Sequence, residues 1–173
     1  DYLQNNFTGL EYNCTIEKEP LGTGGAIHLA CKHANTDQVL IANGDTVFKI
    51  EVDKFLKSHL ESMSACTLAL KPMKNFDRYG AVELNSDNSI KKFSEKKYVE
   101  SGLINGGLYL LNRAQFLSLD FPAKFSFEKD YLESTSEKLT GYVDDGYFID
   151  IGVPEDYQKA QEDFSTPALD LSA

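Results

Sequence analysis

The chain has 173 residues, 42 % of them hydrophobic, and a formal net charge of −10, which together are typical of one ordinary globular domain. Such an acidic chain lacks the basic surface by which proteins bind nucleic acid. No apolar run approaches the roughly 18 residues that span a bilayer, so no membrane partner is expected.

Short apolar runs predict several strands along the chain. Polar and apolar residues alternate over residues 11–17, after a first turn that is expected to end a helix at Asn5 and Asn6. Unbroken apolar runs suit strands buried on both faces of a parallel sheet. Such runs occupy residues 39–42, 65–70 and 108–111, and one more strand is expected at 147–151.

Helices are expected between these strands, and a β-hairpin interrupts the alternation. Residues 81–84 and 90–93 flank a polar turn of five residues, Asn85–Ser89, as in a hairpin. The strand and helix order predicts an α/β fold with a mostly parallel sheet and an inserted hairpin. The predicted helices cover residues 26–34, 52–60 and 127–138, and the last opens at Pro154.

A glycine-rich segment, Glu19–Ala26, lies between the first predicted strand and the first complete helix. Its three glycines would let the backbone approach a flat ligand or a phosphate, next to a helix N-terminus that favours an anion. The segment has neither the dinucleotide-binding fingerprint nor the Walker spacing. A tight strand-to-helix turn would also explain its glycines.

Two aspartates are candidate metal ligands. Asp45 directly follows the apolar run at 39–42, at a strand end where α/β sheets bind ligands, although it could also form a turn or cap a helix. Asp150 lies inside an apolar run, where a carboxylate needs a cation, hydrogen-bond donors or a turn. The sequence therefore allows both carboxylates to share one Mg²⁺ ion.

Polar residues near the hairpin and before the strand at 108–111 are candidate substrate contacts. Lys96 could neutralise a phosphate, although lysines on turns are commonly only solvated. Asn105 carries a donor and an acceptor, which suits a sugar hydroxyl. Gly106 and Gly107 would weaken a strand unless something must come close to them.

In this order, the segments resemble the sugar-phosphate nucleotidyltransferases over about residues 12–164. Within that family, residues 20–26 and 148–157 are most similar to the heptose 1-phosphate guanylyltransferases. The resemblance implies a Rossmann-like α/β fold and a Mg²⁺-dependent cytoplasmic enzyme. Such an enzyme makes a nucleotide sugar, GDP-heptose or GDP-mannose, and pyrophosphate from GTP and a sugar 1-phosphate, for surface polysaccharides. It implies no nucleic-acid or membrane partner and allows a homo-oligomer.

The resemblance also implies residue roles. Asp45 and Asp150 would hold the metal, and Lys96 would hold the attacking phosphate, so these three residues would be catalytic. The nucleotide would contact Pro20, Leu21, Gly22, Thr23, Gly24, Asn43 and Gly44. The sugar would contact Gly80, Glu95, Asn105, Gly106 and Glu128.

One family feature is missing from this sequence. The G-x-G-T-R-L loop that cradles the triphosphate should precede Glu11, and it does not. We therefore expect a nucleotidyltransferase domain at 1–164 that lacks this loop, a tail at 165–173, and a chain that is inactive by itself.

Other activities are compatible with the same motifs. The alternatives are a thymidylyl-, uridylyl- or cytidylyltransferase acting on glucose 1-phosphate, and a module that binds sugar phosphate or nucleotide without catalysis. A glycosyltransferase is disfavoured because Asn43 replaces the first carboxylate of its Asp-x-Asp motif. Three widely spaced cysteines, with no Cys-x-x-Cys pair, favour the reducing cytoplasm over a zinc site or disulfides.

Overall fold

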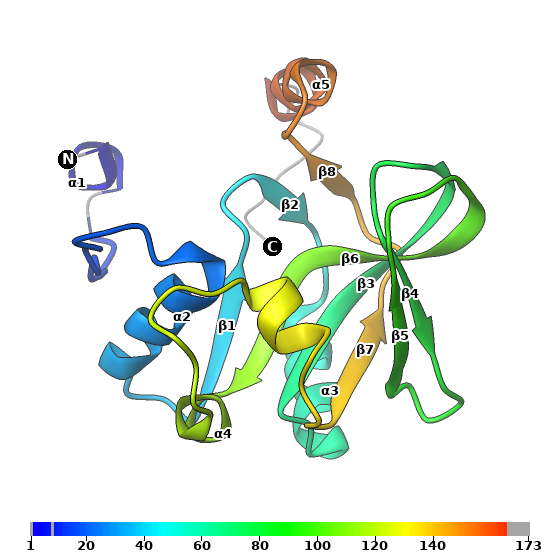
Figure 1. Cartoon of the computed structure of the whole chain (residues 1–173). Coiled ribbons are helices and arrows are strands. Elements are labelled where there is room, and N and C mark those ends of the chain that lie inside the picture. The colour runs from blue at the N-terminus through cyan, green and yellow to red at the C-terminus, as the bar shows by residue number, and fades with distance from the viewer. Residues whose placement is uncertain (1, 8, 166–173) are drawn as a thin grey trace.

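The protein is described by a computed structural model over residues 2–7 and 9–165. Six strands form one sheet with the order β5-β4-β6-β3-β7, and β1 pairs with β6 (Figure 1). A second, two-stranded sheet pairs β2 (Thr46–Phe48) with β8 (Phe148–Asp150). The strands of the large sheet are β1 (Gln38–Ala42), β3 (Cys66–Phe76), β4 (Ala81–Leu84), β5 (Ile90–Ser94), β6 (Val99–Asn112) and β7 (Leu139–Val143).

The predicted α/β class is confirmed, and the large sheet is mixed. Strands β1, β3, β4 and β7 run in one direction, whereas β5 and β6 run in the other. Because β6 lies between β1 and β3, most neighbouring strands are antiparallel, and β3 with β7 is the parallel pair among the described strands. The long strand β6 also pairs with two strands along one edge. Residues 108–112 pair with β1 and residues 103–104 pair with β4, so residues 105–107 lie between the two pairings.

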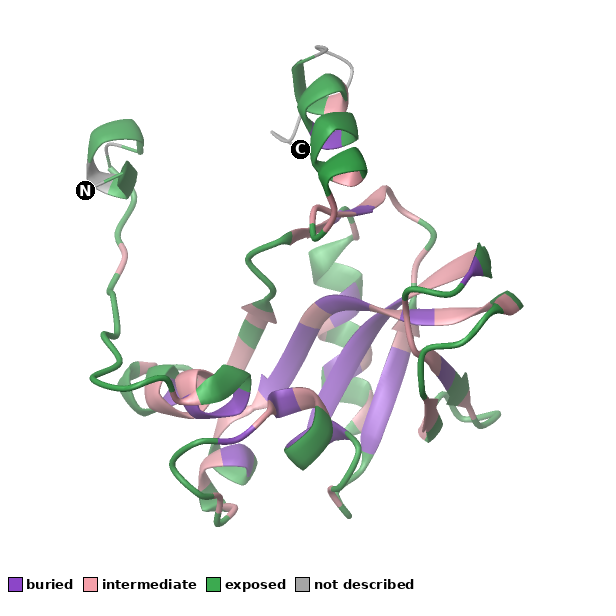
Figure 2. Ribbon diagram, turned by 45° about the horizontal axis from the view of Figure 1, so that its top comes forward, coloured by how far each residue is buried: buried purple, intermediate pink, exposed green. Residues whose placement is uncertain are grey.

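Two hydrophobic clusters lie on opposite faces of the large sheet, because neighbouring side chains of a strand point to opposite faces. Leu68 and Leu111 belong to one cluster, and Ala69 and Leu110 belong to the other. Figure 2 shows these central strands as the buried part of the molecule.

Helices cover both faces of the sheet (Figure 1). The larger cluster contains residues of α2 (Gly22–His33), α4 (Arg113–Ser118) and a π-helical turn (Phe127–Leu132), and the smaller one contains Phe55 of α3 (Val52–Ser62). The remaining helices are α1 (Tyr2–Asn6) and α5 (Pro154–Ser165). Among the described residues, no helix is long and apolar enough to cross a membrane.

Two predicted elements are wrong. Residues 11–17 form no strand, and Ile16 is 84 % exposed, because no described strand lies beside this segment to accept its hydrogen bonds. The helix expected at 127–138 ends at Leu132. Beyond it, the Ser134 hydroxyl donates to the Lys129 carbonyl and Thr135 accepts from the Glu137 N–H, so side chains satisfy backbone groups that a helix would have used.

The other predicted elements are confirmed with altered ends. Helix α2 begins four residues earlier than expected, inside the glycine-rich segment, and β3 and β6 extend well beyond their apolar runs. The hairpin of β4 and β5, the helix α3, the strand β8 and the helix opening at Pro154 lie where predicted. Strands β2 and β7 and helix α4 were not predicted. Of the expected tail, residues 166–173 lie outside the described residues.

Candidate active site

A cleft of about 670 Å³ opens where β1 and β4 separate along the edge of β6. Its walls come from the turn after β1, the hairpin, the middle of β6, the π-helical turn and the small sheet. Seven of the predicted site residues line it: Asn43, Gly80, Glu95, Lys96, Asn105, Glu128 and Asp150.

The floor of the cleft is a polar network between β1 and β6. The Asn105 amide donates to the Tyr109 hydroxyl at 2.9 Å, and its carbonyl oxygen accepts from the Gly107 N–H at 3.1 Å. The Gly107 carbonyl in turn accepts from the Asn43 N–H at 2.9 Å. Gly107 has a φ of 74°, which favours glycine, and the Asn43 side chain occupies the space of a Cβ. Asn43 and Asn105 are therefore fixed side by side.

The two predicted metal ligands meet through the small sheet. Thr46 lies directly opposite Asp150 in the antiparallel pair of β2 and β8, and both line the cleft. The Asp45 carbonyl accepts from the Ile151 N–H at 2.9 Å, and the Asp45 carboxylate accepts from the Thr46 hydroxyl at 3.3 Å. The backbone of Asp45 therefore lies next to that of Ile151, the neighbour of Asp150, although Asp45 itself does not line the cleft.

These carboxylates fit a Mg²⁺ ion. Asp150 accepts a hydrogen bond from the Gly152 N–H at 2.8 Å, and neither aspartate forms an ion pair with a described residue. Within the described part of the chain, no group of three His, Cys, Asp or Glu residues is arranged to hold a metal. Mg²⁺ is commonly held by one or two carboxylates together with water and substrate phosphates, and Asp150 in the cleft with the exposed Asp45 nearby fits that pattern.

Lys96 and Glu95 follow β5 and form the hairpin side of the cleft. Both side chains are exposed, and neither is in an ion pair with any residue that the structure describes. Gly80 faces the same end of the hairpin, where an added Cβ would lie 2.6 Å from the Ser94 carbonyl oxygen. Glycine at position 80 therefore lets the two hairpin strands close tightly beside Lys96.

The glycine-rich segment packs against the chain rather than surrounding an open space. The Gly24 N–H donates to the Phe125 carbonyl at 3.0 Å, and an added Cβ at Gly24 would lie 2.2 Å from the Phe125 ring. Gly22 has a φ of 72° and also approaches Phe125, and Gly25 approaches Ala123. Close packing in a tight turn therefore explains in part why all three positions are glycine. Pro20 and Gly22 remain on the surface, and Leu21 is half-buried.

Thr23 connects this segment to the cleft. Its hydroxyl donates to the Glu128 carboxylate at 2.9 Å and accepts from the Phe127 N–H at 2.9 Å. Ser126 also donates to Glu128, at 3.2 Å. Glu128 thus lines the cleft from the π-helical turn while it holds the start of α2 in place.

Eight of the predicted site residues do not line the cleft: Pro20, Leu21, Gly22, Thr23, Gly24, Gly44, Asp45 and Gly106. Gly106 is buried, and an added Cβ would lie 2.3 Å from the Phe48 ring, so this glycine makes room for packing beneath the small sheet. Gly44 is exposed, with nothing within 4 Å of an added Cβ.

The cleft also contains side chains that the sequence reading missed, above all Tyr79. Burial and the nearby Asp150 carboxylate raise the pKa of Tyr79 to about 12, so its phenol stays protonated and can donate to Asp150. Its ring also packs edge-on against Phe148. The signal in the sequence was its position directly before Gly80. Thr46, Tyr109, Lys129 and Phe148 line the cleft as well.

The sequence matches the nucleotidyl transferase family over residues 1–166. It is 46 % identical over 164 residues to D-glycero-alpha-D-manno-heptose 1-phosphate guanylyltransferase of Aneurinibacillus thermoaerophilus, covering 94 % of this chain and 71 % of that protein. It is 43 % identical over 159 residues to the protein of the same name from Campylobacter jejuni, covering 91 % of this chain and 69 % of that protein.

Two solved structures are also similar to this chain. The crystal structure of HddC from Yersinia pseudotuberculosis matches with a TM-score of 0.86 and 35 % identity, over 94 % of this chain and 72 % of that one. A second structure of HddC, complexed with GMP-PN, matches with a TM-score of 0.84 and 36 % identity, over 94 % of this chain and 71 % of that one.

Proposed function

Because the chain belongs to the nucleotidyl transferase family, we propose that it transfers a guanylyl group from GTP to D-glycero-α-D-manno-heptose 1-phosphate and releases pyrophosphate. The base and the sugar are those named for two relatives that are 46 % and 43 % identical to it. We further propose that the enzyme is cytoplasmic and supplies a precursor of surface polysaccharide.

The observation that carries this proposal is the meeting of three kinds of group in one cleft. Asp150 brings a carboxylate from the small sheet, Lys96 brings a cation from the hairpin, and Asn105 brings an amide from β6. A sugar 1-phosphate needs hydrogen bonds for its hydroxyls and positive charge for its phosphate. Lys96 and Asn105 line the same cleft and can contact both parts of such a molecule.

The reaction needs alignment and charge neutralisation more than proton transfer. An oxygen of the sugar phosphate forms a bond to the α-phosphorus of GTP, and the bond from that phosphorus to the pyrophosphate oxygen breaks. The attacking oxygen is already an anion, so no side chain has to remove a proton from it. Lys96 would hold the attacking phosphate, and Asn105 would orient the sugar.

Asp45 and Asp150 would hold Mg²⁺, which when bound offsets negative charge on the phosphates of the nucleotide. The Thr46 hydroxyl orients the Asp45 carboxylate, and the Gly152 N–H orients that of Asp150. Tyr79 can add a third hydrogen bond to this arrangement, because its pKa of about 12 keeps the phenol protonated.

The exposed residues Pro20 and Gly22 and the half-buried Leu21 would lie against the guanine base. Thr23 joins this segment to Glu128 at the cleft, which makes a continuous surface for nucleotide and sugar phosphate. This part of the proposal rests on the resemblance of the segment to its family, because Gly24 and Gly25 are occupied by packing against residues 123–125.

A panel of four nucleoside triphosphates against heptose, mannose and glucose 1-phosphates, with the protein encoded by the complete gene, tests the proposal through pyrophosphate release. GTP with the heptose 1-phosphate should give the highest kcat/KM. A higher kcat/KM with TTP, UTP or CTP and glucose 1-phosphate would replace the proposal by that activity. Calorimetric binding of these ligands without any turnover would favour a binding module.

A further inference from the structure

The small sheet that carries the candidate metal ligands is not part of the large sheet. Among the described residues, no backbone ladder joins β2 or β8 to the strands of the large sheet. Phe48 at the end of β2 packs on Gly106 of β6, and Phe148 of β8 packs edge-on against Tyr79. Lys96 and Asn105, however, belong to the large sheet and its hairpin. An attachment of the small sheet to the central strand β3 would further fix the aspartates relative to them.

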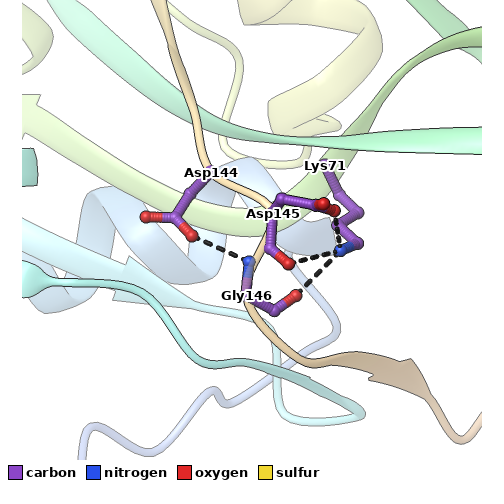
Figure 3. A network of polar contacts seen from close by, with 4 residues as sticks. All are labelled: Lys71, Asp144, Asp145 and Gly146. Carbon is purple, nitrogen blue, oxygen red and sulfur yellow. Dashed lines mark hydrogen bonds and ion pairs between the residues drawn. The ribbon is translucent and has the colours of Figure 1, made fainter.

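Lys71 of β3 provides such an attachment (Figure 3). Its ammonium group donates to the Asp145 carboxylate at 2.5 Å, to the Asp145 carbonyl at 2.9 Å and to the Gly146 carbonyl at 2.9 Å. A lysine has three N–H donors, so one short turn uses all of them. The Lys71 side chain is only 16 % exposed, which strengthens these bonds relative to those of a surface lysine.

The turn at residues 144–146 is itself held by hydrogen bonds. The Asp144 carboxylate accepts from the Gly146 N–H at 2.8 Å, and the Asp144 N–H donates to the Leu70 carbonyl of β3 at 3.0 Å. Gly146 lies so close to the Lys49 carbonyl that an added Cβ would clash with its oxygen, and the Lys49 N–H donates to the Tyr147 carbonyl at 2.8 Å. The turn therefore touches β3 on one side and the residue after β2 on the other.

We infer that Lys71 is a positioning residue, which fixes the small sheet with Asp45 and Asp150 against the part of the cleft that holds Lys96 and Asn105. This inference rests on the proposed function, because it takes both aspartates as metal ligands. Lys71 does not line the cleft, and all its donors are used within the turn, so it acts through β8 and not on a substrate.

The direct test measures Mn²⁺ binding to the protein encoded by the complete gene. Electron paramagnetic resonance monitors this binding in the presence of a non-hydrolysable GTP analogue. Lys71→Met should weaken Mn²⁺ binding about 10-fold, as the loss of a residue that orients a metal ligand does. The KM for the sugar 1-phosphate should change less than about twofold, because its contacts stay on the large sheet and hairpin. Lys91→Met is the matched control, since it removes only an exposed ion pair with Glu83.

Wild-type Mn²⁺ affinity in Lys71→Met would overturn the inference. If that variant does not fold, Asp145→Ala decides instead. The Asp145 side chain is 82 % exposed, so its loss should leave the fold intact and weaken Mn²⁺ binding about threefold. An unchanged affinity there would also overturn the inference. Asp150→Asn separates the two proposals. If this variant binds Mn²⁺ with wild-type affinity, the proposed metal site is wrong. If this variant binds Mn²⁺ weakly while the Lys71 and Asp145 variants keep wild-type affinity, only the role of Lys71 is refuted.

Discussion

Thr46 of β2 lies directly opposite Asp150 of β8, and its hydroxyl donates to the carboxylate of Asp45. A strand pair of three residues on each side thus joins two aspartates that are far apart in the sequence. Because the Ile151 N–H also donates to the Asp45 carbonyl, the backbone on both sides of this contact is fixed. The proposed metal site therefore depends on the small sheet as a whole.

Lys96→Met should lower kcat/KM for the sugar 1-phosphate about 10- to 100-fold, because it removes a hydrogen bond between two charged groups. Lys97→Met is the matched control: Lys97 is also exposed but does not line the cleft. Steady-state kinetics at saturating GTP measure the effect. Equal losses in the two variants would show that Lys96 acts only through the general charge of the hairpin.

Gly24→Ala should destabilise the fold by about 1–3 kcal/mol, since its Cβ would overlap the Phe125 ring. That ring cannot easily move, because it is buried and stacked on Phe121 with 4.3 Å between centroids. Gly44→Ala should leave stability unchanged or raise it by up to about 1 kcal/mol, because its Cβ would meet nothing. Urea unfolding measures both. Similar losses at the two positions would refute the packing role of Gly24.

Stability should fall as the pH decreases below about 6.5, the ordinary pKa of histidine. His59 is 2 % exposed, and burial lowers its pKa in the folded state. Between the two pKa values the unfolded chain binds the proton and the folded chain does not, so acid favours unfolding by up to about 1.4 kcal/mol per pH unit. The neutral ring contacts Thr67 at 2.7 Å and Gln38 at 2.9 Å.

Urea unfolding between pH 5 and pH 8 checks this prediction with His59→Gln. The variant should be less stable than the wild type at pH 8, because it disturbs a buried polar network, and the difference should shrink toward pH 5. His28 has a pKa that burial and Lys32 lower, so some pH dependence of the same sign should remain in the variant. A constant difference across this pH range would exclude His59 as a source of the pH dependence.

Several parts of the fold followed from local patterns. The hairpin turn needs only the polar residues between β4 and β5, and helix α3 follows from its apolar spacing. Residues 11–17 show the limit of this approach. Alternating polar and apolar residues are compatible with a strand that has one buried face. A strand also needs a neighbouring strand to form its backbone hydrogen bonds, and a local pattern does not show whether one is present.

The candidate site, too, could be predicted only in part from the sequence. Asp45 and Asp150 were each predicted as metal ligands from their surroundings in the sequence, but their proximity depends on β2, a strand too short to leave a pattern. Glycines were harder to interpret, because close approach to a ligand and close approach to the chain require the same residue. Gly106 and Gly24 make room for Phe48 and Phe125, which are distant in sequence. Lys71 was not identified, since its partners lie on a turn more than 70 residues away.

The most direct measurement of the central claim is the rate of GDP-heptose formation at saturating Mg²⁺ by Asp45→Asn and Asp150→Asn, in the protein encoded by the complete gene. Asp53→Asn, on the exposed first turn of α3, is the control for loss of one carboxylate. Both variants should lose about 100-fold or more in rate with an unchanged melting temperature, while the control stays active. A rate within tenfold of the wild type in either variant would contradict the assignment of that aspartate to the metal site.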